Sequence, residues 1–585
     1  MNKMSLRDVC YASFGPLGRA LLKAFKRVDK DLEASGMAIH PEVYLSIASF
    51  IAILSPAISF TLLVTSTLLL GLPKVGLPVL ILFIVFPPLL VIMISLILPR
   101  LVLANKISKL KIEIPYASMY MSVMVSGGLS PYASLLRLRK MNLMPILSQD
   151  IKRIQRTVLA TGADPVSAME RAAKTCDLKE YKDLLLGYAS TIRTGGDVLH
   201  YLYSQTVTMF RDMKTRLKAV GETMGMLMET YMIVAVLGAL GLYMIFIVSL
   251  ALPDVGLRIT PAQFFLFAFV VLPAISLVFM YISDTMQINY PLSNWKIYAV
   301  FLAMLPLGLF LISQMVLPYL DMGRAFTSLY ALPRQLRLLL RFGEGSEPVL
   351  GLAISLIAIT LPVAILDVHE SSRERNILNE VTNFLRDLVE NRKSGLSPER
   401  CIQALASKDY GKFTKHLKRI AAELKWGFSL RSIFEGFKKK TKNWLTLIYI
   451  YLLIDTIEVG GGTEESLEAL TEFAESAKSM EKERSTMLTP LLIVPYIGAA
   501  LLTVTTILFL QFFSKMSAIS NVSVPYITLT KILLTPLIFH AYMLGMVTGK
   551  IISGKTSSGF KHAILLTLAA LAGIWIASNF SFAFI

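Results

Sequence analysis

One segment of the chain carries a pattern that could bind a nucleotide. Residues 549–556 read Gly-Lys-Ile-Ile-Ser-Gly-Lys-Thr and match the phosphate-binding loop GxxxxGK[ST]. Such a loop works between a strand and a helix, where backbone N–H groups surround the phosphates. Here one long apolar run precedes the segment, another begins at 563, and no strand pattern lies before it. We therefore interpret 549–556 as a short, basic, glycine-rich turn.

Other residues that could bind metals or catalyse reactions form no group in the sequence. The six histidines include no pair at ligand spacing, and Cys10, Cys176 and Cys401 form no CxxC motif or disulfide framework. His540 lies inside an apolar run, where a hydrogen bond between helices is the favoured explanation and a functional proton site the alternative. The sequence predicts no catalytic residue, no metal and no cofactor, and therefore no enzyme.

The composition points to a membrane. Of the 585 residues, 54% are hydrophobic and only 17% are charged, whereas a soluble domain has about 25% charged residues. The charges concentrate in two blocks, 105–225 and 368–486. The net charge of +18 fits the lysine and arginine excess of cytoplasmic segments, which lie against anionic lipid, better than it fits binding to nucleic acid.

A membrane-spanning helix needs about 20 mostly apolar residues. About nine stretches meet this requirement, and the sixth is the shortest: 43–71, 76–98, 228–252, 262–282, 297–318, 349–366, 487–512, 529–549 and 563–585. The fold class that follows is an all-α, polytopic membrane protein.

Flanking charge gives the orientation. The basic N-terminus is placed in the cytoplasm, so both charged blocks are cytoplasmic and the C-terminus lies outside. Loop 319–348 contains four arginines and yet falls outside by parity. The resulting divisions are a cytoplasmic amphipathic segment 1–42, spans one and two in 43–104, a helical domain 105–225, spans three to six in 226–367, a second helical domain 368–486, and spans seven to nine in 487–585.

The two charged blocks repeat the same helix breaks. Residues 126–131, Ser-Gly-Gly-Leu-Ser-Pro, match Lys-Ser-Gly-Leu-Ser-Pro at 393–398, and two later glycine-containing breaks match at nearly the same offset. Because an even number of spans separates the blocks, they form a parallel internal duplication. The glycines that we expect to end helices are Gly128, Gly162, Gly195, Gly196, Gly395, Gly427, Gly461 and Gly462.

Two basic clusters in the blocks could bind an acidic partner. The first follows the Ser-Pro helix start of the first block and the second lies within the second block: Arg137, Arg139, Lys140, and Lys438, Lys439, Lys440, Lys442. A solvated face or contact with lipid head groups is the alternative interpretation.

The repeated block, with its Gly-Leu-Ser-Pro helix start, central glycine and Gly-Gly break before a span, resembles the type II secretion system F domain. The length and duplication are most similar to the archaeal platform proteins of this family. The resemblance extends from about residue 110 to the C-terminus, and it includes 549–551 and 559–562. Block one departs from block two because it lacks an acid equivalent to Glu458.

The resemblance implies a platform in the cytoplasmic membrane beneath a type IV filament, such as an archaellum or pilus, or in a related secretion machine. It implies a cytoplasmic hexameric ATPase, prepilin-like or archaellin subunits and membrane lipid as partners, assembly as a homo-oligomer, and no nucleic acid. The alternatives are a polytopic transporter or channel with parallel repeats, and a nucleotide-binding enzyme at 549–556.

Overall fold

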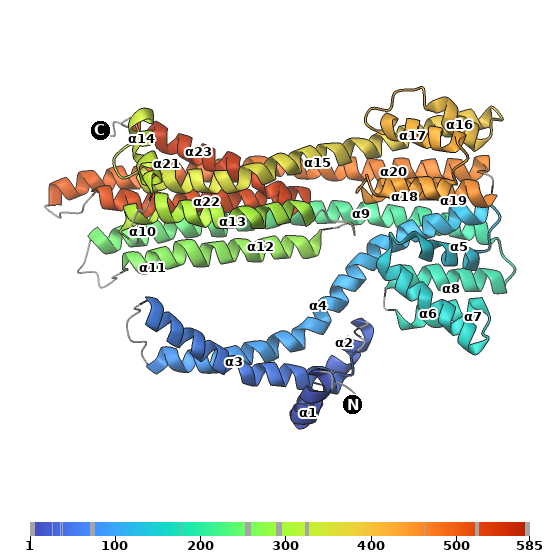
Figure 1. Ribbon diagram of the computed structural model, residues 1–585, viewed down its shortest axis with the longest axis horizontal. Coiled ribbons are helices and arrows are strands. Elements are labelled where there is room, and N and C mark those ends of the chain that lie inside the picture. Colours follow the sequence, from blue (N-terminus) through green and yellow to red (C-terminus); the bar gives the residue numbers. More distant parts are fainter. Residues whose placement is uncertain are drawn as a thin grey trace. The chain divides into compact units, whose positions relative to one another are not determined.

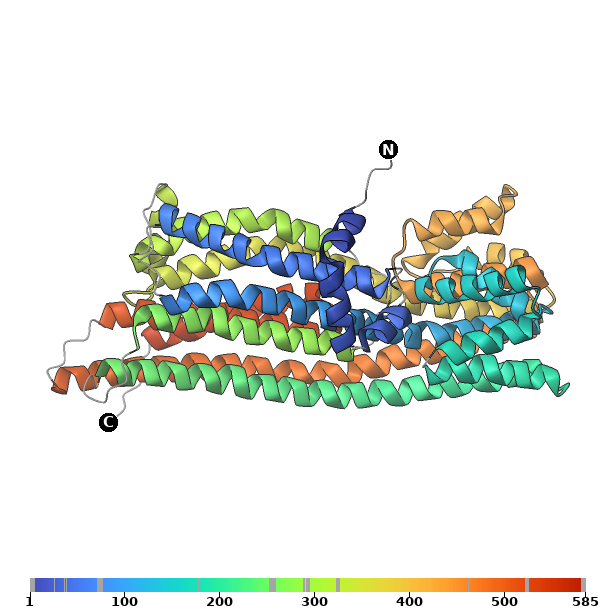
Figure 2. The same cartoon turned by 90° about the horizontal axis from the view of Figure 1, so that it is seen from below.

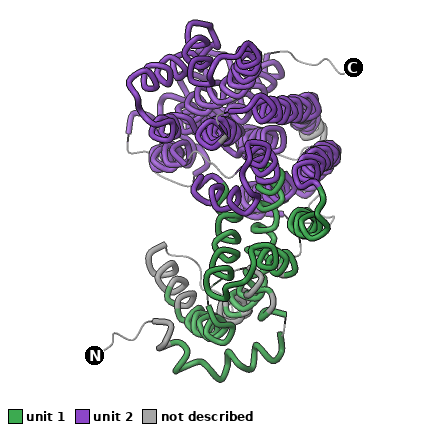
Figure 3. Tube along the Cα trace, turned by 90° about the vertical axis from the view of Figure 1, so that its right-hand side faces the viewer, with its two compact units in different colours: residues 1–116, 144–196 green, residues 117–143, 197–585 purple. Residues whose placement is uncertain are grey.

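The computed structural model is built from α-helices. It describes residues 6–25, 27–35, 37, 39–70, 77–176, 178–251, 259–287, 290, 295–321, 327–460, 462–520 and 526–579. Within these ranges no strand occurs, which confirms the all-α expectation. The chain forms two compact units, coloured separately in Figure 3: residues 1–116 with 144–196, and residues 117–143 with 197–585.

The first unit begins with helices α1 and α2, which fill the expected amphipathic segment. Helix α1 packs along α3, and Gly18 permits this close approach because a Cβ atom there would lie 2.5 Å from the Ser46 hydroxyl. Phe14 and Phe50 add a ring contact. The helices of this unit are α1 (Leu6–Ala24), α2 (Arg27–Ser35), α3 (Pro41–Leu70), most of α4 (Leu77–Ser126), α6 (Pro145–Thr161), α7 (Pro165–Thr175) and α8 (Lys179–Arg193).

The second unit holds the remaining helices. They are α5 (Pro131–Leu138), α9 (Val198–Met232), α10 (Gly238–Ala251), α11 (Pro261–Leu266), α12 (Leu272–Met286), α13 (Trp295–Met315), α14 (Ala331–Leu340), α15 (Glu347–Lys393), α16 (Pro398–Leu405), α17 (Phe413–Lys425), α18 (Leu430–Lys438), α19 (Trp444–Gly460), α20 (Glu464–Leu488), α21 (Ile493–Ser520), α22 (Tyr526–Ser553) and α23 (Gly559–Asn579).

Eight helices in the described part of the chain are long and apolar enough to cross a membrane. They overlap the second to ninth expected spans. A shorter apolar stretch of α3, Pro41–Ala57, lies in the first expected span. The chain is therefore a multi-pass membrane protein, as its composition predicts.

Helix α22 is the centre of the membrane bundle. Its apolar window is 94% buried inside the protein, and α12, α15, α21 and α23 pack around it. Its closest partner is α23, because Gly545 and Gly549 lie against Ala563 and Gly559. A Cβ atom on either glycine of α22 would overlap a backbone carbon of α23. Small residues four apart allow such close packing of membrane helices.

Several helices pass from the apolar bundle into the charged blocks without a break. Residues Val198–Ser249 form one 52-residue helix, and Glu464–Phe513 form another of 50 residues. These two helices occupy equivalent positions in the repeat, and Figure 2 shows them side by side. Tyr203 donates a hydrogen bond to Glu472 at 2.5 Å, and Lys214 and Lys218 both pair with Glu483.

Candidate functional site

The first repeated helix break has the same structure in both copies. Gly128 (φ +92°) and Gly395 (φ +87°) adopt left-handed conformations at the ends of α4 and α15. Ser130 and Ser397 then cap α5 and α16, since each hydroxyl accepts a hydrogen bond from the backbone N–H three residues later. The matched sequence Gly-Leu-Ser-Pro thus encodes a matched helix end and helix start.

The other two breaks also correspond. Asp164 and Ser429 cap α7 and α18, and Asp197 and Thr463 cap α9 and α20. The glycines with positive φ at these breaks are Gly162, Gly195, Gly427 and Gly462. Gly196 has no positive φ, but a Cβ atom there would lie 3.2 Å from Thr191. Gly461 lies outside the described residues.

A pair of glutamates extends the repeat beyond its helix breaks. The fully buried Glu113 carboxylate accepts N–H groups from Ile146 and Leu147, at 3.4 and 2.7 Å, in the first turn of α6. The Glu380 carboxylate accepts the N–H of Phe413 at 2.8 Å, in the first turn of α17. Both caps stabilise the positive end of a helix.

The two glutamates are separated in the sequence by the same interval as the first repeated break. Identical residues at that interval therefore identify both glutamates from the sequence, whereas the helix breaks alone do not.

Arg137, a candidate docking residue, faces a buried carboxylate. Its Nη1 atom lies 3.3 Å from Oδ1 of Asp455 in α19, whose side chain is 3% exposed. The contact is an ion pair without hydrogen-bond alignment, whereas the Tyr120 hydroxyl donates a hydrogen bond to the other carboxylate oxygen. Arg137 therefore joins the first copy to the second. Sequence reasoning missed Asp455 as its partner.

The neighbouring basic residues are placed differently. Arg139 is half-buried and Lys140 is exposed, in the single turn after α5. In the second copy Lys438 is half-buried, while Lys439, Lys440 and Lys442 are exposed after α18. The structure brings the lysines of the second copy together on one turn.

His416, in α17, lies against the second cluster. Its ring meets the edge of Phe437 at 5.2 Å between centroids. Burial, together with the charges of Arg373, Lys440 and Arg419, lowers the pKa of His416 from its ordinary value. Burial and the neighbouring positive charges therefore both disfavour protonation of the imidazole.

The segment 549–556 is not a phosphate-binding loop. Its first five residues are the last turns of α22, and Gly554 (φ +74°) ends that helix. Lys555, which would contact phosphate in such a loop, pairs with Glu374 at 3.0 Å. This geometry supports the interpretation as a structural turn.

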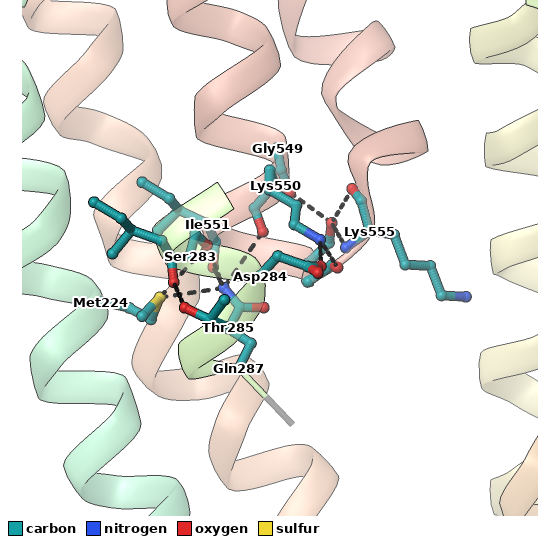
Figure 4. Close-up of polar contacts among 12 residues, drawn as sticks. Met224, Ser283, Asp284, Thr285, Gln287, Gly549, Lys550, Ile551 and Lys555 are labelled. Carbon is teal, nitrogen blue, oxygen red and sulfur yellow. Dashed lines mark hydrogen bonds and ion pairs between the residues drawn. The ribbon is translucent and has the colours of Figure 1, made fainter. Parts of the chain in front are cut away.

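Figure 4 shows the polar contacts that hold this turn. The Lys550 side chain is 6% exposed, and its Nζ atom pairs with Asp284 of α12 and donates to the carbonyl of Gly554 at 2.8 Å. Gln287 Nε2 donates to the carbonyl of Ile551 at 2.5 Å. The end of α22 is therefore tied to the end of α12, because these side chains satisfy carbonyl groups that a helix end leaves unpaired.

No group of three or more histidine, cysteine, aspartate or glutamate side chains in the described ranges could hold a metal ion. The polar clusters in these ranges instead join helix to helix.

Comparison with known proteins agrees with the repeat. Residues 117–246 and 384–511 match the family model for type II secretion system (T2SS), protein F. The chain carries this domain twice. The starts of the two matches are separated by the same interval as Gly128 and Gly395. The domain indicates a membrane platform protein of type II secretion or type IV pilus-like systems, a class of proteins that are not enzymes.

A more distant similarity covers most of the chain. An uncharacterized protein of Methanocaldococcus jannaschii is 21% identical over 434 residues, which make up 68% of this chain and 67% of that protein. No solved structure matches the chain.

Proposed function

We propose that the protein is the cytoplasmic-membrane platform of a type IV filament, an archaellum or pilus, or of a related secretion machine. It couples a cytoplasmic hexameric ATPase to the extraction and polymerisation of prepilin-like subunits. The observation that carries this proposal is the duplicated T2SS protein F domain, each copy of which continues directly into a membrane helix.

Continuous helices supply a physical means of coupling. The 52- and 50-residue helices run from the charged blocks into the apolar bundle. At a rise of 1.5 Å per residue each is about 75 Å long, more than twice the thickness of the hydrocarbon core. A movement imposed on a helical domain therefore displaces the membrane end of the same helix, where a subunit in the bilayer would be in contact.

Contacts join the two copies of the domain, so that a movement of one copy is passed to the other. Tyr203–Glu472 and the ring contact between Phe210 and Phe473, with centroids 5.4 Å apart, link α9 to α20. The Arg137–Asp455 pair adds a second link. In this proposal both helical domains face the cytoplasm, the C-terminus lies outside, and several copies assemble beneath the filament with lipid around them.

The test is purification of the tagged protein from its native cells in a mild detergent, followed by mass spectrometry and by deletion of its gene. The proposal expects a hexameric secretion ATPase or prepilin-like subunits to co-purify, and the deletion strain to lose a surface filament or a secreted product. A protein that purifies alone, from cells whose filaments and secretion survive the deletion, would favour the transporter instead.

A further inference from the structure

The second copy ends helix α17 with exposed aromatic residues that its repeat partner lacks. Trp426 is 82% exposed and Phe428 is 54% exposed, on either side of Gly427. The corresponding residues of the first copy, beside Gly162, are Thr161 and Ala163. Tryptophan is enriched among the residues that carry most of the binding energy of protein interfaces, whereas leucine and valine are under-represented there.

Gly427 presents these two rings. Its φ of +79° ends α17, and the N–H of Phe428 donates to the carbonyl of Glu423. Ser429 then caps α18. The backbone that carries Trp426 and Phe428 is therefore fixed by this turn, so that binding loses little backbone entropy there.

A row of lysines leads to this turn. Lys415, Lys418 and Lys425 are exposed, and their spacing places them on one face of α17. The basic residue between them, Arg419, is paired with Glu423 at 2.5 Å. In the described part of the chain these three lysines form no ion pair with an acidic side chain. We define Lys415, Lys418, Lys425, Trp426 and Phe428 as the α17 tip.

The helix that carries the α17 tip lies beyond the membrane bundle. Helix α17 begins beside Glu380, which lies on α15 well beyond the end of the expected span 349–366. A helix rises 1.5 Å per residue, so this start is roughly 20 Å past the end of that span along α15. Figure 1 shows α16 and α17 beside the end of α15 that lies opposite α14 and α23.

We infer that the α17 tip is the docking site for an acidic, apolar-grooved face of the cytoplasmic ATPase, an inference that rests on the proposed function. The lysines attract the acidic face and the aromatic residues fill its groove, because charge sets the rate of association and buried tryptophan supplies much of the affinity. The motor then binds through the second copy, and the first copy follows through the α9–α20 contacts.

The experiment measures binding of the purified ATPase to the full-length protein in detergent. We expect Trp426→Ala with Phe428→Ala to weaken binding at least about tenfold, and Lys415→Glu with Lys418→Glu to slow association and reduce its salt dependence. The matched control is Leu159→Ala, since Leu159 is 76% exposed near the corresponding turn of the first copy. It should change affinity by less than about twofold.

The outcomes separate this inference from the proposed function. If the wild-type protein does not bind the ATPase at all, both fail. If it binds and the tip variants bind equally well, only the α17 tip is wrong. A third measurement compares the quenching of tryptophan fluorescence by brominated lipids in vesicles of the wild-type protein and of Trp426→Phe. If Trp426 accounts for the quenched fluorescence, the α17 tip lies in the bilayer, and the inference is overturned. Because the changed side chains are exposed, the variants should fold normally, which their unfolding midpoint checks.

Discussion

Asp455 is a buried carboxylate whose two partners, Tyr120 and Arg137, both belong to the other copy of the domain. A buried charge without its counter-ion is strongly destabilising. Arg137 therefore supplies the positive charge that balances the buried carboxylate of Asp455.

We expect Arg137→Met to lower the free energy of unfolding by about 2 kcal/mol, below the range for fully buried pairs because Arg137 is 29% exposed. Lys140→Met, at an exposed position nearby, should change it by less than about 0.5 kcal/mol. Unfolding in mixed micelles of SDS measures both. Equal stability of the two variants would mean that the buried pair contributes nothing.

His416 gives the second residue-scale prediction. Because the folded protein holds its pKa below the ordinary value, the unfolded chain binds the proton more tightly in the window between the two values. The contribution of neutral His416 to the free energy of unfolding is complete above its ordinary pKa of about 6.5. It is lost as the pH falls from there through the lowered pKa of the folded protein.

The unfolding midpoint of the wild-type protein should therefore decrease on acidification by more than that of His416→Leu, which has no proton to bind. The measurement is thermal unfolding in one detergent at a series of pH values. Parallel curves for the two proteins would show that His416 makes no contribution to the acid sensitivity.

At the scale of helices, the packing of α22 against α23 depends on the absence of side chains. Gly549 lies so close to Gly559 that any side chain would push the two helices apart. Gly241 of α10 differs, because a Cβ atom added there would meet nothing within 4 Å outside its own helix turn. Its environment therefore has room for a methyl group.

Gly549→Ala should accordingly destabilise the protein by about 1–3 kcal/mol, the usual cost of overpacking. Gly241→Ala should be neutral or slightly stabilising, because alanine is the better helix former. The yield of monodisperse protein and its unfolding in SDS compare the two. A neutral Gly549→Ala would show that α22 and α23 can separate at little cost.

At the scale of the whole molecule, the proposed topology places both helical domains on one side of the membrane. The parallel repeat requires this arrangement, since an even number of spans separates the copies. The arginine-containing loop 319–348 then lies on the other side, against the charge rule. Arg337 in this loop is paired with Glu347 at 3.2 Å, with both side chains largely buried, which reduces the positive charge that the loop exposes.

A membrane-impermeant maleimide tests this topology. In a background without native cysteines, Lys140→Cys and Lys439→Cys should react only after the cells are permeabilised, whereas Arg334→Cys should react in intact cells. All three positions are exposed. Labelling of Lys439→Cys but not Lys140→Cys in intact cells would contradict the parallel arrangement.

Local patterns in the sequence were sufficient for much of the fold. Apolar runs predict the spans, since burial in lipid depends on the composition of about 20 consecutive residues. The Gly-Leu-Ser-Pro breaks predict helix ends, because the caps form within a few residues of Gly128 and Ser130, or of Gly395 and Ser397. Comparing the breaks revealed the duplication.

Only the tertiary structure decided which of these helices meet. Arg137 and Asp455 lie in different copies of the domain, far apart in the sequence, and nothing in their local sequences selects one for the other. The same holds for Lys550 with Asp284, and for the exposure of Trp426, which no helix in the described part of the chain covers. Such features arise from long-range packing, whereas the sequence by itself determined the apolar runs and the repeated helix breaks, because both depend on neighbouring residues.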